Sequence, residues 1–379
     1  MSFVLSEEQT ILRDSAKGFI SEKSPVIALR KLRDARDETG FDRTLWEEMA
    51  EMGFVGIVIP EDYGGAGFGY RGLGLVLEEA GRTLMASPLV STALLSASAI
   101  LIGGNEDQKK ALLPEIAAGR LIVALAVDEG PHHNPARIAA RAKASGTGFT
   151  LTGEKTFVLD GHVADRLIVA ARTAGSPGET RGITLFLVDG SARGMTRTRH
   201  LMVDSRNAAT VRLEGVEVGA EAVIGEVDAG FDVLGEALDR ARICLSAEML
   251  GAATEAFERT LAYLKERKQF GVPIGSFQAL KHRAAKMFCE LELCQSVVAD
   301  ALSAIDERRN DVAQMASLAK ARMGATFNLV SSEAVQMHGG IGVTDEHEIG
   351  FFLKRARVAD ATFGTVGFHS QRYAELEGY

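Results

Sequence analysis

Three long stretches with helical periodicity lie in the C-terminal part of the sequence and restrict the folds that the chain can adopt. Residues 231–268, 275–305 and 311–338 each place apolar side chains at helical spacing. Amphipathic helices of this length bury their apolar faces against one another, and neighbouring helices then form a bundle. We therefore predict a C-terminal four-helix bundle over residues 227–379.

The N-terminal part also has helical patterning. Ser6 and Gln9 predict a capping box, in which each side chain accepts a hydrogen bond from the other residue's backbone N–H. The helical pattern continues over residues 72–83 and 106–116. These segments predict a helical domain over residues 1–118.

The middle of the chain, residues 119–226, consists of short β-rich runs separated by glycine-containing turns. The absence of helical patterns between these runs favours an antiparallel barrel or sandwich over a βαβ sheet. The predicted class is therefore α+β, with an N-terminal helical domain, a middle antiparallel β-barrel domain and a C-terminal four-helix bundle. The predicted strands are residues 121–127, 149–152, 156–159, 166–171, 183–188 and 209–218.

Composition excludes several classes of protein. The 379 residues are 46% hydrophobic and 25% charged, which is typical of a globular chain, and the net charge of −9 argues against a nucleic-acid surface. The sequence contains no stretch of 18 uncharged apolar residues, so we expect no membrane span, and its first residues do not resemble a signal peptide. Cys244, Cys289 and Cys294 fit no metal-ligand spacing, so we expect reduced thiols, no metal and a cytoplasmic protein.

Two local patterns carry little weight. Gly67–Gly72 matches the GxGxxG dinucleotide fingerprint, but no second βαβ unit follows it, and a glycine-rich surface loop is the simpler interpretation. His132 and His133 are adjacent and have no third ligand at a fixed spacing, so we interpret them as part of a solvated loop.

Two other patterns are ambiguous alone. Glu266–Gly271, with the sequence ERKQFG, is followed by Phe277 and Gln278, and arginine suits a phosphate because its planar fork donates two parallel hydrogen bonds. The same residues also suit an ordinary helix end. Gln336–Gly342, with the sequence QMHGGIG, has glycines that permit the close approach of a ligand or equally form a helix stop.

The order and spacing of these two motifs together resemble the acyl-CoA dehydrogenase family. Three further segments support the resemblance, which covers nearly the whole chain. They match the family's PExxGGxG segment, its GxKxWITNG segment and the start of its first long C-terminal helix, and they are Pro60–Gly67, Gly153–Gly161 and Leu238–Arg242.

The resemblance implies an FAD-dependent oxidoreductase that desaturates an acyl-CoA thioester and passes electrons to electron-transfer flavoprotein or a similar acceptor. In this family a carboxylate takes the α-proton, the flavin takes the β-hydride, and FAD lies across a subunit interface of a tetramer. Asp239 and Arg242 match residues near the acyl-CoA. The residues that match contacts to FAD are Arg267, Phe270, Gln278, Gln336, Met337, His338, Gly339, Gly340 and Thr365.

The chain departs from the family where the chemistry occurs. The two positions at which members carry the catalytic glutamate hold Phe363 and Ala241, and neither side chain can accept a proton. The flavin-ring loop TEPGAGSD is replaced by Asp128–Pro135, with the sequence DEGPHHNP. Leu159 stands where a hydroxyl is expected beside the flavin. No catalytic base is therefore identified.

These departures favour a subunit of a hetero-oligomer whose partner supplies the catalytic glutamate, as in α2β2 acyl-CoA dehydrogenases that often act on bulky acyl groups such as steroid side chains. A homotetramer that desaturates its substrate with an unrecognised base is the second hypothesis. The third is an acyl-CoA-binding or protein-binding scaffold without redox chemistry. The carboxylates considered for the unrecognised base are Asp128, Glu129, Asp160 and Asp239.

Overall fold

A computed structural model describes residues 4–379, so the first three residues of the predicted N-terminal domain lie outside the described residues. The chain forms two compact units, each assembled from segments that are distant in sequence. The first, which we call the helical unit, contains the chain up to Arg36, Tyr70–Met85 and Arg242–Tyr379. The second, the sheet unit, contains Asp37–Gly69 and Ala86–Ala241.

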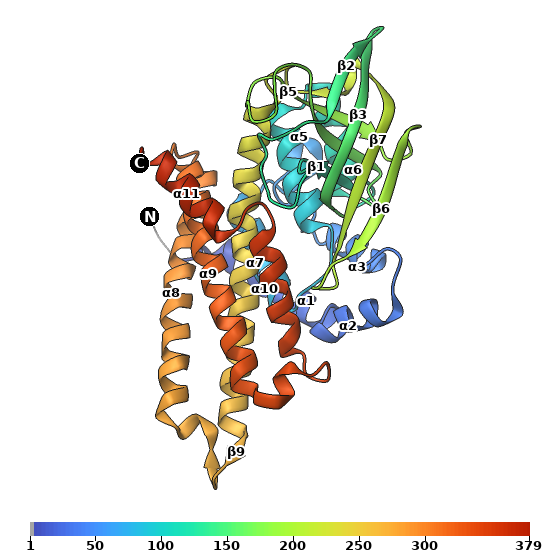
Figure 1. Ribbon diagram of the computed structural model, residues 1–379. Helices are drawn as coiled ribbons and strands as arrows, with labels where there is room; N and C mark the ends of the chain where they lie inside the picture. The colour runs from blue at the N-terminus through green and yellow to red at the C-terminus, as the bar shows by residue number, and fades with distance from the viewer. Residues whose placement is uncertain (1–3) are drawn as a thin grey trace. The chain divides into compact units, whose positions relative to one another are not determined.

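Long C-terminal helices form most of the helical unit, and Figure 1 shows α8, α9 and α10 running beside one another. The predicted helical stretches are confirmed as α7, α8 and α9, of which α7 contributes its part from Arg242 onward to this unit. Two shorter helices, α10 and α11, pack against α9. The helices are α7 (Gly230–Glu266), α8 (Gln278–Asp306), α9 (Val312–His338), α10 (Ile349–Ala361) and α11 (Val366–Leu376), with short helices η4 (Ile274–Ser276) and η5 (Gly339–Val343).

Three N-terminal helices complete the helical unit: α1 (Glu7–Lys23), α2 (Val26–Ala35) and α4 (Gly69–Arg82). All of α4 except its first residue, Gly69, belongs to this unit. The predicted capping box is confirmed at the start of α1. Ser6 Oγ accepts a hydrogen bond from Gln9 N at 3.2 Å, and Gln9 Oε1 accepts one from Ser6 N at 3.1 Å.

The sheet unit packs short helices beside a β-sheet. The helices are α3 (Arg43–Glu51), η1 (Glu61–Tyr63), the π-helical η2 (Leu89–Ser96), α5 (Ala97–Gly103), α6 (Glu106–Ala117) and η3 (Ala220–Ala222). The strands are β1 (Val123–Ala126), β2 (Arg141–Ser145), β3 (Gly148–Leu159), β4 (Arg166–Arg172), β5 (Ile183–Asp189), β6 (Met195–Leu201), β7 (Asn207–Gly219) and β8 (Val223–Ile224).

The strand order is β6-β7-β3-β2-β4-β5-β8, and β1 pairs with β4. Most pairings are antiparallel, as predicted, but β1 and β2 both pair with β4 in parallel, which the sequence pattern did not indicate. The predicted strands 149–152 and 156–159 are one continuous strand, β3, whose pairing with β7 shifts register between Lys155 and Val158. This irregularity places Phe157 at a φ of 55°, in the left-handed region that a phenylalanine rarely adopts.

The GxGxxG match at Gly67–Gly72 does not belong to a dinucleotide-binding unit. Residues 54–59 before it form turns, and α4 begins at Gly69 within the motif. The interpretation as a glycine-rich loop therefore applies to its first half, and the second half is helical. Within residues 4–379, no helix is both long and apolar enough to cross a membrane.

Candidate functional site

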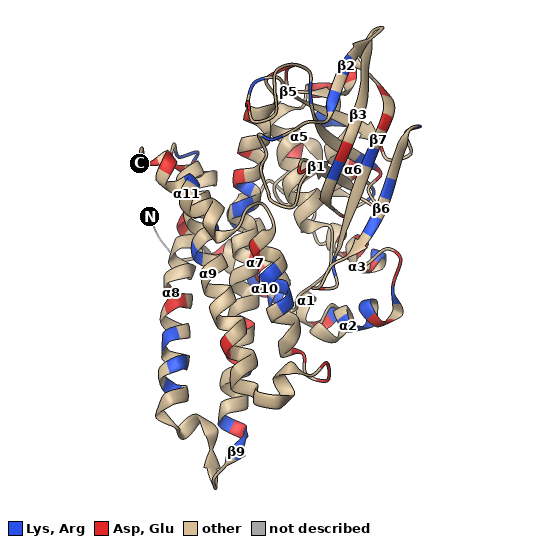
Figure 2. Cartoon of the chain, viewed as in Figure 1, with Lys and Arg blue, Asp and Glu red and all other residues tan. Residues whose placement is uncertain are grey.

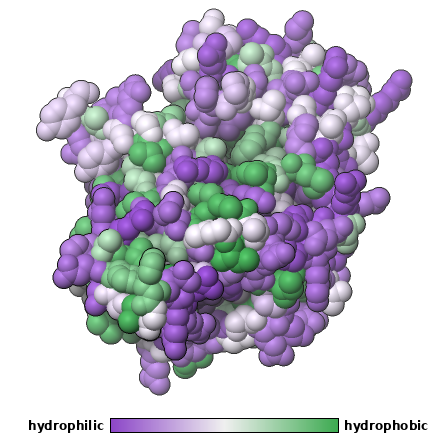
Figure 3. Space-filling view, turned by 60° about the horizontal axis from the view of Figure 1, so that its bottom comes forward, coloured by the Kyte–Doolittle hydropathy of each residue, from purple (hydrophilic) through white to green (hydrophobic). Residues whose placement is uncertain are grey.

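The first motif forms a hairpin that links α7 to α8 within the helical unit. The hairpin strands are β9 (Lys268–Gln269) and β10 (Val272–Pro273), and the turn between them is Phe270–Gly271. Phe270 is 93% exposed, and its ring lies edge-on to that of Phe277 at a centroid distance of 6.1 Å. Figure 3, in which the hairpin end comes forward, shows apolar residues at the surface among hydrophilic ones. Arg267 and Gln278 are also exposed.

The second motif lies at the C-terminal end of α9. Gln336 is exposed, Met337 and His338 are buried, and Gly339 ends the helix with a φ of 63°. Gly339 and Gly340 are exposed, and a Cβ atom added to either would meet nothing within 4 Å. The backbone at this helix end is therefore open to close approach by another group.

The structure brings the two motifs together at one end of the helical unit. The ring of Tyr263, whose carbonyl accepts a hydrogen bond from Arg267 N, stacks on the ring of His338 at a centroid distance of 4.4 Å. His347 lies beyond, with its ring 4.6 Å from that of His338. Sequence reasoning missed Tyr263 and His347, because neither lies within a motif and only the packing of α7 on α9 joins them.

Several features of this end fit a phosphate-bearing nucleotide. His338 Nδ1 lies 2.7 Å from Ala334 O and donates its hydrogen to that carbonyl, which leaves Nε2 as a buried acceptor without a partner among residues 4–379. Burial lowers the pKa of His338, so the ring is neutral. Figure 2 shows Lys and Arg positions on the half of α8 that adjoins the hairpin. They include Lys281, Arg283 and Lys286.

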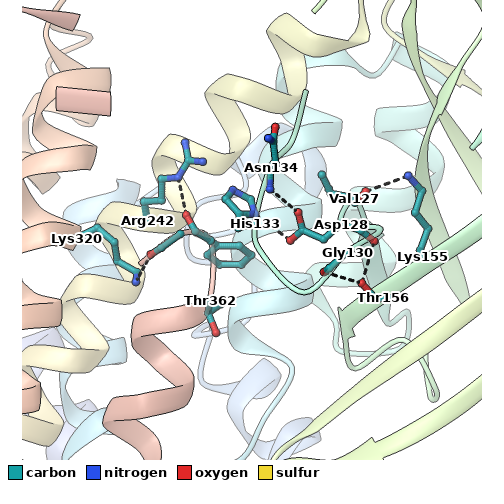
Figure 4. A network of polar contacts seen from close by, with 12 residues as sticks. Val127, Asp128, Gly130, His133, Asn134, Lys155, Thr156, Arg242, Lys320 and Thr362 are labelled. Atoms are coloured by element: carbon teal, nitrogen blue, oxygen red, sulfur yellow. Dashed lines mark hydrogen bonds and ion pairs between the residues drawn. The ribbon is translucent and has the colours of Figure 1, made fainter. Parts of the chain in front are cut away.

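The turn at Phe363 holds the residue that the family resemblance aligns with the first base position. Phe363 is buried and has a φ of 59°. Its carbonyl oxygen accepts a hydrogen bond from Arg242 Nε at 3.1 Å (Figure 4). The same oxygen lies 3.0 Å from His369 Nε2. Burial lowers the pKa of His369 to about 2, so a neutral ring donates Nε2–H to this carbonyl.

A fully buried lysine fixes the same turn from the other side. Lys320 Nζ donates to the carbonyl oxygens of Ala359, Asp360 and Gly364 at 2.8, 3.0 and 3.0 Å. Burial lowers the pKa of Lys320 to about 7. Thr365, which follows the turn, caps α11 by accepting a hydrogen bond from Phe368 N at 3.4 Å. Its side chain thus has a structural role in addition to the one implied by the family resemblance.

Neither family base position offers a proton acceptor in the folded chain. Ala241 is fully buried on α7, and Phe363 contributes only its backbone carbonyl to the polar contacts described above. Asp239 and Arg242, which match substrate-side residues, are both buried on α7. The turn at Phe363 is therefore held by buried nitrogen donors rather than by a carboxylate.

The loop Asp128–Pro135 of the sheet unit contains an Asp–His pair. Asp128 Oδ2 lies 2.9 Å from His133 Nδ1, and Asp128 Oδ1 accepts a hydrogen bond from Asn134 N at 3.2 Å (Figure 4). The side chain of His133 is 3% exposed. Thr156 N donates to the carbonyl of Asp128 at 2.7 Å, so β3 holds the start of the loop. The sequence did not single out this pair, because adjacent histidines gave no sign of which one turns inward.

Glu129, the next residue, has a structural role. Its carboxylate accepts hydrogen bonds from Ala139 N at 2.7 Å, from Ala140 N at 3.0 Å and from Lys155 Nζ at 2.6 Å. Lys155 is fully buried, and burial lowers its pKa. Asp160, another carboxylate considered as a base, accepts a hydrogen bond from Ser91 Oγ at 2.6 Å. Leu159 ends β3 half-buried and brings no hydroxyl.

Comparisons with known proteins agree with the fold and the motifs. Three domain families match consecutive parts of the chain: the acyl-CoA dehydrogenase N-terminal domain over residues 6–120, the middle domain over 128–216 and the C-terminal domain over 228–375. The chain is 31% identical to the caffeyl-CoA reductase-Etf complex subunit CarC of Acetobacterium woodii over 366 residues, which is 95% of each chain.

Solved structures of two complexes contain similar chains. One is a variant of the Tcur3481-Tcur3483 steroid ACAD, with a TM-score of 0.88, 32% identity and 98% of both chains covered. The other is the ChsE4-ChsE5 complex of Mycobacterium tuberculosis, with a TM-score of 0.90, 26% identity and all of both chains covered. With the domains matched in order and relatives aligned from end to end, the chain belongs to the acyl-CoA dehydrogenase family of oxidoreductases.

Proposed function

We propose that the chain is a subunit of a heteromeric, FAD-dependent acyl-CoA dehydrogenase whose partner subunit supplies the catalytic glutamate. The observation that carries the proposal is the turn at Phe363. At this family base position, a buried phenyl side chain replaces a carboxylate, and Arg242, Lys320 and His369 hold the surrounding backbone. The second base position, Ala241, is equally without a proton acceptor.

The nucleotide end of the helical unit supports a role for FAD. Arg267 and Gln278 would bind the pyrophosphate, and Gln336–Gly340 would bind the AMP side of a neighbour's FAD, with Phe270 and Met337 packing beside it. The exposed guanidinium, the open glycines and the unfilled acceptor of His338 suit such a group. FAD, when bound, accepts the hydride that leaves the β-carbon of the substrate. On this reading Thr365 would approach the adenine.

The substrate class follows from the family. An acyl-CoA thioester would lie near Asp239 and Arg242, and Arg242 would place positive charge close to the reacting acyl group. The named complexes of similar chains, one of them described as a steroid enzyme, support a heteromer that acts on a bulky acyl group. The CarC relative belongs to a complex with Etf, which supports an electron-transfer flavoprotein as the acceptor.

The proposal is tested by expressing the chain alone and together with the family member encoded beside it. Flavin per chain is measured from the absorbance of the purified protein, and turnover is measured with a panel of acyl-CoA thioesters. We expect little bound flavin and no turnover for the chain alone, and both properties for the co-expressed complex. Full flavin occupancy in the isolated homo-oligomer would refute the proposal. If the chain binds acyl-CoA but remains free of flavin, both alone and after co-expression, the scaffold hypothesis is selected instead.

The Asp128–His133 pair favours one second candidate, a self-sufficient dehydrogenase. The carboxylate of Asp128 lies 2.9 Å from His133 Nδ1 and would stabilise the imidazolium if this histidine took a proton. Glu129 cannot serve because its three donors already occupy the carboxylate.

This candidate predicts turnover by the pure chain that is lost in His133→Gln and kept in the matched variant His132→Gln, whose histidine is exposed. Absence of turnover by the pure chain, with activity of the complex unchanged in His133→Gln, would exclude it.

A further inference from the structure

Residues 344–348 follow the glycine motif directly and join η5 to α10, and we call them the linking loop. Its first residue is tied back to η5, because Thr344 Oγ1 donates to Ile341 O at 2.8 Å. Its last residue is tied to α7, because Glu348 pairs with Arg259 at 2.7 Å. The loop is therefore held at both ends within the helical unit.

The middle of the linking loop is held by α2, from a position 312 residues earlier in the chain. Arg33 Nη1 and Nη2 donate to Asp345 Oδ1 and Oδ2 at 2.6 and 2.7 Å, so the guanidinium holds both carboxylate oxygens. Arg30 Nη1 donates to Asp345 Oδ2 at 3.0 Å. Among residues 4–379, Asp345 is the only acidic partner of Arg30. We call these three residues the Asp345 clamp.

The Asp345 clamp rests on an aromatic ring of α10. The Cζ atoms of Arg30 and Arg33 lie 4.7 and 5.1 Å from the ring centroid of Phe351, and Lys354 Nζ lies 5.6 Å from it. Phe351 is buried, so the ring gives both guanidinium groups a fixed surface and adds a cation–π attraction. Hydrogen bonding by Arg33 lowers the pKa of Asp345 to about 2, so the carboxylate is ionised at neutral pH.

The linking loop adjoins the segment that we expect to meet the nucleotide. Its residue His347 has its ring 4.6 Å from that of His338, the last residue of α9. Gly339 and Gly340, which come next, leave room for close approach by a ligand, but glycine backbone is also the most flexible. Ordering a flexible segment when a ligand binds weakens the affinity. A segment whose following loop is already fixed needs less ordering.

The Asp345 clamp lies too near the surface to contribute much to the stability of the whole chain. The side chain of Asp345 is 58% exposed and that of Arg33 is 25% exposed. An ion pair with this much contact with water stabilises a fold only slightly. Three hydrogen bonds from two arginines to one carboxylate nevertheless restrict where the linking loop can lie. The main effect of the clamp is therefore local.

We propose that Arg30 and Arg33 of α2 are positioning residues for FAD, which act through Asp345 by fixing the linking loop and thereby the glycine segment Gly339–Val343. The arginines do not bind the nucleotide in this assignment. They reduce the conformational freedom of the segment that binds it, so less order has to be gained on binding. The inference rests on the proposed function, because it assigns these residues a role at the nucleotide end of the helical unit.

The first test measures the order of the glycine segment by hydrogen exchange in the full-length chain without flavin. In Asp345→Asn, peptides that cover residues 339–348 should exchange about three- to fivefold faster, the range expected for losing a partly exposed ion pair. The matched control is Asp34→Asn, since Asp34 also pairs with Arg33 and its side chain is equally exposed at 58%. This control removes the same charge but leaves the Asp345 clamp intact, so exchange should not change.

The second test measures FAD affinity in the co-expressed complex, from the fluorescence of the flavin that is released on dilution. The dissociation constant should rise about three- to fivefold in Asp345→Asn and stay unchanged in Asp34→Asn. Arg33→Gln should cause a smaller rise, because Arg30 still holds Asp345. Added to Asp345→Asn, it should cause no further rise, because both changes remove the same interaction. A merely structural role would lower resistance to urea without changing FAD affinity.

Unchanged exchange or unchanged FAD affinity in Asp345→Asn would overturn the inference. Equal effects in Asp34→Asn would also overturn it, since they would indicate only a general electrostatic effect. A wild-type complex without flavin would overturn the proposed function and this inference with it, whereas flavin in the wild type with unaffected variants would overturn the inference alone. If Asp345→Asn does not fold, the comparison of Arg33→Gln with Asp34→Asn decides the question.

Discussion

Replacing Lys320 by methionine tests how the turn at Phe363 is held. Methionine keeps most of the side-chain volume and removes all three donors to the carbonyl oxygens of Ala359, Asp360 and Gly364. Each lost hydrogen bond is worth about 1 kcal/mol net, so the turn should lose about 3 kcal/mol of local stability. Part of this loss is offset because methionine avoids the desolvation of an amine.

The effect should be local, so hydrogen exchange measured by mass spectrometry is the suitable assay. Peptides that cover residues 359–369 should exchange about a hundredfold faster in Lys320→Met, while peptides of the sheet unit remain unchanged. The matched control is Lys110→Met, which removes an exposed lysine from α6 in the sheet unit. Exchange in 359–369 equal to that of the wild type would refute the role assigned to Lys320.

The pH dependence of the same comparison has a definite sign. The pKa of Lys320 is lowered from 10.5 to about 7 in the folded chain, so between these values the unfolded chain binds more protons. The stability that Lys320 confers therefore rises with pH over this window. The difference between wild type and Lys320→Met should grow from pH 7 to pH 9. A difference that shrinks over this range would contradict the assigned direction of the shift.

Three further changes have expected outcomes. Glu248→Ala removes the buried ion pair with Arg355 and should lower the free energy of unfolding by about 3–5 kcal/mol in urea titrations, whereas a loss below about 1 kcal/mol would contradict the role of the pair. Ser6→Ala removes the capping box of α1 and should cost about 1 kcal/mol, seen as faster exchange in the first turn only. Asp345→Asn removes the partner of Arg33, which lowers the pKa of that carboxyl to about 2. The substitution should have a small, salt-sensitive effect on the free energy of unfolding that is present above pH 4 and vanishes as the pH falls towards 2. An effect that grew in acid would be inconsistent with the lowered pKa of Asp345.

Periodicity was sufficient to predict the long helices and most of the central strands. Their apolar residues repeat at the period of the element, and burial in the structure follows the same pattern. Strands β2 (Arg141–Ser145) and β6 (Met195–Leu201) were missed because they are mostly exposed and charged, so they carry little apolar alternation. The parallel pairings with β4 depend on chain connectivity, which no local pattern encodes.

The residues of the candidate site also fall into those that local sequence patterns predicted and those that they did not. The exposed motif residues were found from sequence, because glycine and arginine at those spacings indicate nucleotide chemistry. The buried nitrogen donors around Phe363 were not found. Lys320 and His369 lie on different helices and meet only after α9 packs on α11, so nothing in their own neighbourhoods distinguishes them from surface residues. The same holds for the orientation of His133 towards Asp128.

The exposed ring of Phe270 at the hairpin tip bears on how the chain persists in the cell. Phe270 is 93% exposed on a two-residue turn, so apart from its contact with Phe277 most of its apolar surface is open to other apolar surfaces. Chains in which this tip remains uncovered would be prone to aggregation and to proteolytic degradation. If the heteromer proposed above covers this tip, the persistence of the chain in the cell would depend, through one side chain, on the amount of the covering subunit.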